Sequence, residues 1–416
     1  MQQSVDSHWD TQYEWKIVIL LFLGFGLVGL DRWIIAPLFP FIAEDLGLAP
    51  SSIGTLAGAL GVVWGVFAIF SGRMADIIGH RKILIPAIFI FSLLSGFSGM
   101  AQGLVGLVLI RGLMGATEGA FAPTMVVAVG VASKPSRRGF NQGFQQCGFA
   151  LFGLALGPII ATQLLGIVPS WREVFWVVAI PGFIVGTLLY FVLREPQDTQ
   201  GAAIIGTDQG GGSWSDVLKS RNIVVAMIAL FCTMTGVFIL SAMVPVYLTE
   251  VIQLNPTDMG LVASALGFGG FFGQGGWPGM TDKFGRKPLV VLGFIGACIG
   301  TIWFAQIGPN ILLLFVVLMV TSFFCLGNIS VITGPICTES APPGLVAAAI
   351  GLVVGVGEIF GGGLMPIVAD FTARNYGLTS VLYVAAGGLA LGIVVSLFFE
   401  ETAPIRRAVD EPGQIA

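Results

Sequence analysis

Five ionisable side chains lie inside long apolar stretches of this sequence, where a charge is costly. They are Asp31, Arg32, Arg111, Glu118 and Glu358. An ionisable group in hydrocarbon costs roughly 2.5 to 3.5 kcal/mol even on lenient insertion scales, so such groups usually mark the path of an ion or a polar substrate. Carboxyl groups exchange protons, and guanidinium groups bind carboxylates through paired hydrogen bonds. The set therefore predicts proton exchange and anion binding inside a membrane.

Helical spacing decides which of these groups can meet. Arg111 and Glu118 are seven residues apart, which places them on one helix face about 10 Å apart along the axis. They are too distant to pair with each other, so each is expected to contact another helix. Asp31 and Arg32 are adjacent and point about 100° apart, so one can face a cavity while the other contacts a neighbouring helix. A purely structural ion pair between the first and fourth helices is the alternative interpretation.

The composition requires lipid as the solvent. Of the 416 residues, 55% are hydrophobic and only 10% are charged, and the mean hydropathy is +0.92. Soluble domains carry about a quarter charged residues. Because lipid offers no hydrogen bonds to the backbone, apolar runs of this length must be helices, and they lack the alternation of barrel strands. We therefore expect an all-α polytopic membrane protein, with the lipid bilayer as its surroundings.

The apolar runs predict twelve transmembrane helices in two six-helix lobes. The first six are expected near residues 16–42, 51–76, 81–101, 104–132, 138–166 and 172–193. The second six are expected near residues 222–249, 257–281, 287–307, 309–337, 344–370 and 377–399. The resulting units are an N-terminal lobe (1–193), a linker ending in a short interfacial helix (194–221), a C-terminal lobe (222–400) and a tail (401–416).

The two halves repeat each other in parallel register. The charged segment around Asp76 returns around Asp282, 206 residues later, and farther along an offset of 208 links Gly143 to Gly351. Duplicated bundles of this kind are typical of alternating-access carriers. The repeat is the main evidence for transport.

The basic residues predict the orientation of the chain. Two of them, Arg172 and Arg374, fall in loops on one side. The side shared by both termini holds Arg73, Arg81, Lys82, Lys134, Arg137, Arg138, Arg194, Lys219, Arg221, Lys283, Arg286 and Lys287. By the positive-inside rule both termini, the linker and the tail are cytoplasmic. The polar N-terminal segment lacks the features of a signal peptide, so the first helix should stay in the membrane. We expect a multi-pass plasma-membrane protein, or an inner-membrane protein in a bacterium.

The repeated segment resembles the signature between helices two and three of the major facilitator superfamily, which implies the major facilitator fold. Ile77 and Pro278 depart from that signature. The first copy matches at Gly72, Asp76, Gly79, Arg81 and Lys82, and the second at Asp282, Lys283, Gly285, Arg286 and Lys287. An aspartate at a helix end beside a tight glycine turn can accept charge-assisted bonds from a neighbouring helix terminus and so latch the cytoplasmic face. A charge cluster that only sets topology is the alternative.

A narrower resemblance rests on Asp31-Arg32 together with the segment from Arg111 to Pro123. These residues look like the anion:cation symporter family, whose members take up sugar acids, aromatic acids and related organic anions with protons. Spinster-type lipid carriers share the pattern more loosely. The resemblance implies that Arg32 engages the substrate carboxylate, that Asp31 and Glu118 take up protons, and that Arg111 holds the carboxylates in a charge relay.

The repeat supports these roles. At the register of Asp31 and Arg32 the second half has Val237 and Phe238, without charge. The latch-like motif is doubled, whereas the buried charges are not, so we interpret the motif as mechanical and the charges as serving ligand or proton. This interpretation fails if the charged groups face acyl chains or are sealed from every water-accessible path.

Three residues besides Arg32 are candidates for substrate binding. Gln145 and Gln146 on the fifth helix can bond hydroxyl or carboxylate groups, and the resemblance points to a binding glutamine here without choosing between them. Interhelical hydrogen bonding is the alternative. Glu358 departs from the symporter pattern. It is a second proton site, a contact for a cationic group of the substrate, or a protonated carboxyl bonded to backbone that the nearby glycines expose.

These observations favour proton-coupled uptake of a small organic anion by alternating access. An exporter of an amphipathic, drug-like or lipid-like compound is the alternative. An enzyme is disfavoured because no nucleophile and base pair is present, and His8 and His80 lie outside the helices. The repeat and the lack of a charge ring disfavour a channel. The five cysteines show no paired spacing, so no metal or cofactor is expected; neither is a nucleic-acid partner, and we expect a monomer.

Overall fold

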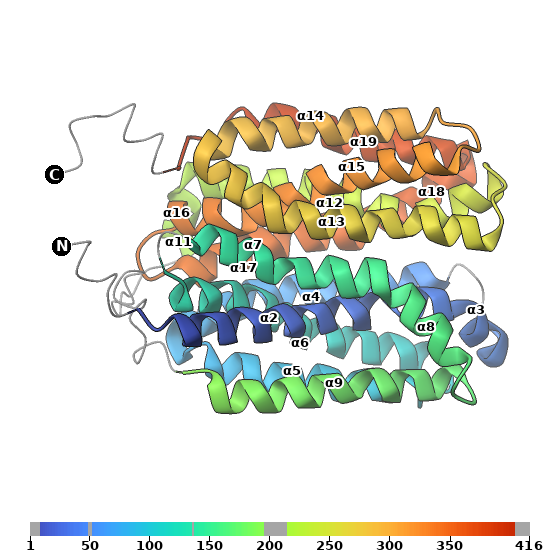
Figure 1. Ribbon diagram of the computed structural model, residues 1–416, viewed down its shortest axis with the longest axis horizontal. Helices are drawn as coiled ribbons and strands as arrows, with labels where there is room; N and C mark the ends of the chain where they lie inside the picture. The colour runs from blue at the N-terminus through green and yellow to red at the C-terminus, as the bar shows by residue number, and fades with distance from the viewer. Residues whose placement is uncertain (1–8, 49–51, 135–136, 195–213, 404–416) are drawn as a thin grey trace.

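The computed structural model describes residues 9–48, 52–134, 137–194 and 214–403, and it places two helical bundles side by side (Figure 1). We call them the first and second lobes. The first lobe contains α2 (Thr11–Trp33), α3 (Ile35–Leu46), α4 (Ser52–Ile78), α5 (Arg81–Ser98), α6 (Leu104–Ala132), α7 (Arg138–Gly148), the π-helical segment η3 (Phe149–Leu156), α8 (Gly157–Leu165) and α9 (Trp171–Val192). The second lobe contains α12 (Arg221–Glu250), α13 (Pro256–Phe284), α14 (Arg286–Phe304), α15 (Ile311–Val331), η5 (Ile332–Ile336), α16 (Cys337–Ser340), α17 (Val346–Gly357), η6 (Glu358–Leu364), α18 (Met365–Tyr376) and α19 (Leu378–Ser396).

These elements form twelve rods in the described chain, as the sequence predicts. Four rods are composite, because α2 continues into α3, and the π-helical segments η3, η5 and η6 join the helices on either side of them. Among the described residues, ten helices are long and apolar enough to cross a membrane. The other two rods are α4, whose apolar run is shorter, and α13, a helix of 29 residues. The helix α11 (Trp214–Lys219) lies where a short linker helix was expected, and residues 195–213 of that linker fall outside the described chain.

The first rod is longer than predicted. It begins at Thr11 rather than near residue 16, because the Asp10 side chain accepts a hydrogen bond from the Tyr13 backbone N–H at 3.0 Å and caps the helix. This bond and the Arg194 guanidinium lower the pKa of Asp10. The rod extends past the predicted end, as α3, to Leu46, where Gly47 adopts a left-handed φ of 61° and stops the helix.

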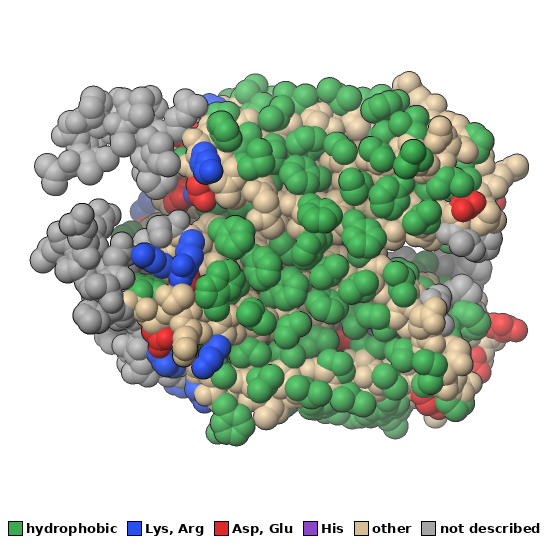
Figure 2. Space-filling model, in the orientation of Figure 1, with side chains coloured by type: hydrophobic (Ala, Val, Ile, Leu, Met, Phe, Trp, Pro, Cys, Tyr) green, Lys and Arg blue, Asp and Glu red, His purple; other side chains and the backbone are tan. Residues whose placement is uncertain are grey.

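The surface agrees with a membrane setting. Apolar side chains cover the middle of the face shown in Figure 2, whereas lysine and arginine side chains gather toward the end where both chain termini lie. We call this the basic end. Large apolar side chains stand exposed on the outer helices, among them Leu109 at 63% and Phe191 at 76%. Such exposure suits acyl chains as the solvent.

The π-helical segments confirm the register of the repeat. Shifted by the offset of 208, η3 falls on residues 357–364, and η6 occupies 358–364. These two segments lie at equivalent places in equivalent rods, whereas η5 of the second lobe has its register equivalent inside the ordinary helix α6. Isolated π turns inside α-helices are frequent at functional sites. Glu358 is the first residue of η6, whereas its counterpart in η3 is the buried Ala150.

Glycines let the two lobes touch. The rod of α4 packs against α17 and η6, and α13 packs against α7 and η3. A β-carbon added at Gly65 would lie 2.7 Å from the Gly355 carbonyl oxygen, and one added at Gly143 would lie 2.6 Å from the Gln274 carbonyl oxygen. Backbone therefore meets backbone at both interfaces, as small residues permit in membranes.

This packing gives a first prediction. Gly65→Ala should slow transport about tenfold without unfolding the protein. Overpacking this contact destabilises the conformation in which the lobes are packed here by roughly 1 to 3 kcal/mol, and each transport cycle must return to that conformation. The measurement is the initial uptake rate in proteoliposomes. Gly276→Ala on α13 is the control, since a β-carbon there meets nothing within 4 Å. Equal rates for both variants would show that the packed interface does not limit the cycle.

Candidate functional site

The five ionisable residues predicted to carry the chemistry are all buried between helices. Their exposed fractions are 3% for Asp31, 9% for Arg32, 2% for Arg111, 0% for Glu118 and 1% for Glu358. None of them is turned toward acyl chains. The first lobe supplies four of them, from α2 and α6, and the second lobe supplies Glu358 from η6.

An ion pair joins the lobes. The Arg32 guanidinium of α2 donates a hydrogen bond from Nη2 to Oε1 of Glu358 in η6. The same guanidinium lies over the Phe238 ring of α12, 4.6 Å from its centroid. A β-carbon added at Gly362 would collide with the Glu358 carboxylate, so this glycine leaves the space that the carboxylate occupies. The sequence left three roles open for Glu358. The structure shows a further contact, an ion pair with Arg32, the residue predicted to bind the substrate carboxylate.

Asp31 and Arg111 connect the first and fourth rods, but not as a direct ion pair. Ser95 Oγ donates to Asp31 Oδ1 at 2.7 Å, whereas Arg111 Nη1 donates to the backbone carbonyl oxygen of Asp31 at 2.8 Å. The second terminal nitrogen of Arg111, Nη2, is buried without a hydrogen-bond partner in the described chain. Arg111 therefore reaches the first helix as expected, with donor capacity to spare.

Glu118 is the isolated member of the cluster. Both of its carboxyl oxygens are buried and have no hydrogen-bond partner among the described residues. The charges that act on it come from Asp31, Arg32, Arg111 and Glu358. An ionised carboxylate held this way is costly unless it is neutralised by a proton or by a moving partner.

The two candidate glutamines of α7 differ in their bonding. Each donates from Nε2 to the Gln142 carbonyl oxygen, at 3.2 Å for Gln145 and 3.3 Å for Gln146. Gln146 Oε1 also accepts a hydrogen bond from Thr333 Oγ1 of the second lobe at 3.2 Å. Gln145 Oε1 is buried with no partner in the part of the chain that the structure describes. Gln145 therefore has the free acceptor.

The second copy of the repeated motif lies against the first lobe at the basic end. Arg286 Nη2 lies 2.6 Å from Asp282 Oδ1 and donates to Glu339 Oε1 at 2.8 Å. A β-carbon added at Gly139 would lie 3.3 Å from Asp282 Oδ1, so this carboxylate faces the first turn of α7 in the other lobe. Gly285 takes a φ of 98°, which favours glycine. Asp282 thus stands at the contact between the lobes, but its ion pair is with Arg286 of its own motif, so the latch stays a prediction.

The first copy of the motif is described in part. Gly72 and Asp76 lie in α4, but the placement of their side chains falls outside the described residues. Gly79 takes a φ of 91°, as a tight turn requires. Arg81 donates from Nη2 to the Tyr190 carbonyl oxygen at 2.6 Å, and from Nη1 to the Leu193 carbonyl oxygen. In this conformation Arg81 binds the end of α9 in its own lobe.

Three acids of this end had no assigned role in the sequence. Glu14 accepts hydrogen bonds from Arg137 Nε at 2.7 Å and from Asn141 Nδ2 at 2.6 Å, and the bonding of Arg137 to the Glu14 carboxylate raises the pKa of Arg137. Glu339 pairs with Arg286 as described above. Glu401 accepts from the Arg286 backbone N–H at 2.8 Å and so caps α14. In the sequence, each of these residues is marked only as an acid close to a helix end. Glu401 is the first residue of the predicted tail, and its bond to Arg286 attaches it to the second lobe.

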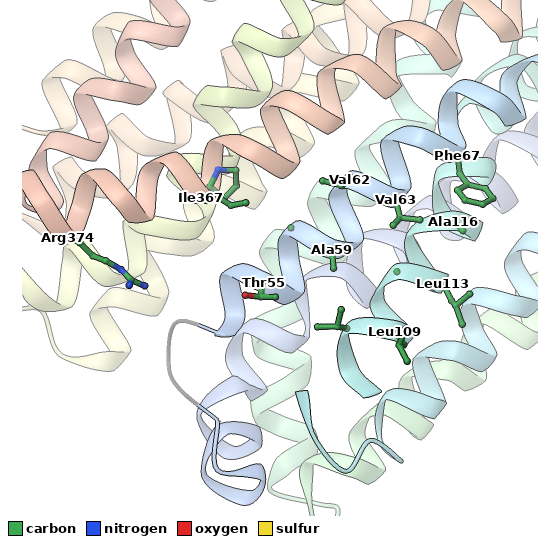
Figure 3. Close-up of a pocket in the computed structure, with 14 residues that line it drawn as sticks. Thr55, Ala59, Val62, Val63, Phe67, Leu109, Leu113, Ala116, Ile367 and Arg374 are labelled. Atoms are coloured by element: carbon green, nitrogen blue, oxygen red, sulfur yellow. The ribbon is translucent and has the colours of Figure 1, made fainter. Parts of the chain in front are cut away.

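A groove separate from the charge cluster opens on the surface between the lobes. Its volume is about 860 Å³, and α4, α6 and α18 line it, with Phe67, Leu113 and Arg374 among the lining residues (Figure 3). Most of its lining residues are apolar, and one of them, Leu113, is 57% exposed. None of the five buried ionisable residues lines it.

Comparisons with known proteins agree with this architecture. A family model described as Major Facilitator Superfamily matches residues 21–277 and 226–414. The probable 4-methylmuconolactone transporter of Cupriavidus pinatubonensis is 26% identical, covering 82% of this chain and 79% of the relative. The hexuronate transporter of Bacillus subtilis is 27% identical, covering 65% of each chain. The solved proton:xylose symporter XylE superposes with a TM-score of 0.78 at 16% identity, covering 95% of this chain and 97% of that one.

Proposed function

The chain belongs to the major facilitator superfamily, and from that premise we propose that it takes up a small organic anion together with protons. Membership confirms the predicted fold and the prediction that this is a multi-pass membrane transporter rather than an enzyme. Relatives named for carrying a muconolactone and hexuronates support a carboxylated substrate. Neither relative decides which acid is carried.

The observation that carries the proposal is the position of Arg32. Its guanidinium is buried where the lobes meet, and it already binds a carboxylate, that of Glu358. Buried guanidinium groups bind carboxylates in paired geometry and more strongly than neutral donors do. Because α2 supplies the arginine and the second lobe supplies its surroundings, an anion bound there touches both moving parts.

The transport cycle follows from the neighbouring groups. With the site open to the outside, Glu118 or Asp31 takes a proton and Arg32 binds the substrate carboxylate. Gln145 Oε1, which has no partner in the described chain, accepts a hydrogen bond from a substrate hydroxyl. Separation of the second motif from the first turn of α7 then opens the basic end, which the positive-inside rule makes cytoplasmic. Arg111 shifts between the carboxyl groups and restores them for the next cycle.

The surface groove favours a second candidate. A largely apolar surface groove between the lobes that carries Arg374 would admit an amphipathic anion from the membrane, as an exporter of such compounds requires. The charge cluster argues against this candidate, because five buried ionisable groups suit a small polar ligand better than an alkyl chain.

Counterflow in proteoliposomes tests the proposed function. Protein would be reconstituted with internal D-glucuronate, 4-hydroxybenzoate or a longer panel of acids, and entry of the labelled acid measured with and without an inward proton gradient. We expect saturable counterflow for at least one acid and faster net uptake with the gradient. An amphipathic dye carried in preference to every acid would favour the exporter, and no saturable transport of any acid would contradict the proposal.

A further inference from the structure

The ion pair between the lobes makes use of an acid that the family resemblance does not require. Glu358 occupies Arg32, the residue assigned to the substrate carboxylate. A substrate carboxylate that approaches the same guanidinium while the ionised Glu358 holds it is repelled, because two negative charges would then share one site. One of them must leave or lose its charge.

The charge balance of the cluster shows which alternative holds. Asp31, Glu118 and Glu358 face only two guanidinium groups, so a neutral empty site requires one protonated acid. Glu118, whose oxygens have no hydrogen-bond partner in the described chain, fits that description. A bound anion adds one more negative charge, so a second acid must be neutralised. The acid that loses its partner on binding is Glu358.

The surroundings of Glu358 leave it no second partner. The elements packed against η6 are α4, α12, α17 and α18. At the described positions they bring apolar atoms to this segment, such as Val62 beside Gly363 and Met234 beside Gly361. Arg32 is the charge that acts on Glu358, and Glu118 also senses the Glu358 carboxylate. Toward their ends these helices also carry the charged residues Arg221, Glu250 and Arg374. They carry Arg73, Asp76 and Asp370 as well, but the side chains of these three lie outside the described residues.

We propose that Glu358 is a built-in substitute for the substrate carboxylate, which holds Arg32 in the empty carrier and gives it up on protonation. The substrate carboxylate forms the ion pair with Arg32 as the pair between Arg32 and Glu358 breaks, and the displaced Glu358 takes one proton from the solution on the open side. Charge is conserved, because one anion enters with one proton. This proposal rests on the proposed function and assigns the binding-linked proton to Glu358.

Binding linked to one proton has a defined pH dependence. Over the pH range in which binding takes up one proton, the affinity of the wild-type carrier for a fully ionised acid should fall about tenfold for each unit by which the pH rises. Glu358→Gln removes the competitor and the proton together. We expect its affinity to change less than twofold from pH 6 to pH 8, and to exceed that of the wild type at least tenfold at pH 8.

The experiment is calorimetric binding to purified full-length protein in detergent at several pH values. The probe is whichever of D-glucuronate, 4-hydroxybenzoate or further panel acids stabilises the wild type against heat but leaves Arg32→Ala unaffected. Glu14→Gln is the matched control, because it also breaks a buried ion pair on α2, that between Glu14 and Arg137, away from the cluster. The control should retain the pH slope of the wild type.

Two failures are distinguishable. If a probe binds through Arg32 and Glu358→Gln keeps the full pH slope, the role of Glu358 is overturned and the proposed function stands. If no acid meets the probe criterion, both are overturned. An infrared measurement needs no ligand: Arg32→Ala at neutral pH should show a carboxyl band that disappears in the Arg32→Ala, Glu358→Gln double variant. Absence of that band would also overturn the proposal.

Discussion

Arg32→Ala should lower the rate of anion uptake at least 100-fold while the folded protein still reaches the membrane. Removing one partner of a buried ion pair costs about 2 to 5 kcal/mol, and here the same side chain is assigned to the substrate. The measurement is the initial rate of acid uptake in proteoliposomes containing equal amounts of folded carrier. Arg32→Lys should recover only part of the loss, because an ammonium group lacks the planar fork that binds a carboxylate at two points.

The control for this prediction is an arginine of the surface. Arg194 pairs with Asp10 at 2.9 Å, and its side chain is half exposed, so its loss removes a positive charge without touching the site. Exposed ion pairs contribute about 0 to 1 kcal/mol, so Arg194→Ala should transport within about threefold of the wild type. If Arg32→Ala took up the acid as fast as this control, the substrate carboxylate would have to bind at another residue.

The elements and the repeat could be predicted from sequence because lipid imposes a local rule. Every apolar run must satisfy its own backbone, so the runs themselves give the rods. The largest departures are the capped start at Thr11, the extension through α3 to Leu46, and the end of α18 at Tyr376 rather than near residue 370. The free-energy cost of an ionisable side chain in hydrocarbon likewise identified the five buried ionisable residues. These are properties of one residue or one segment at a time.

Partners could not be predicted, because they depend on how separate helices pack. Arg32 and Glu358 are 326 residues apart, and no periodicity links them. The spacing of Arg111 predicted contact with another helix, but not that the acceptor is the Asp31 carbonyl oxygen. The difference between Gln145 and Gln146 depends on Thr333 of the other lobe.

The π-helical segments were also missed, for a different reason. Glycine and apolar residues fill η6, and the same composition occurs in the ordinary helices of this chain, so no residue type marks the change of hydrogen bonding. Its effect is nevertheless specific. Glu358 begins the distorted segment, and Gly362 within it clears the space for the carboxylate.

Glu118→Gln should lower accumulation driven by a proton gradient at least tenfold, because only the proton linked to binding at Glu358 is then left to drive uptake, while counterflow stays within about threefold of the wild type. An amide has the shape of a protonated carboxyl but cannot release a proton, so the cycle can exchange labelled for unlabelled acid without moving protons through this position. The measurements are net uptake under an inward proton gradient and counterflow without one. Glu173→Gln is the control, because Glu173 lies in the first turn of α9, where Ser170 donates to its carboxylate, outside the cluster.

The comparison with Glu358→Gln separates the two acids. If Glu118 carries one transported proton and Glu358 carries the one linked to binding, then Glu118→Gln keeps the pH dependence of anion affinity and loses the part of the accumulation that the Glu118 proton drives. Glu358→Gln should lose the pH dependence of affinity, because its Arg32 partner is free at every pH. Accumulation by Glu118→Gln at the wild-type level would assign the transported proton to Asp31 or Glu358 instead.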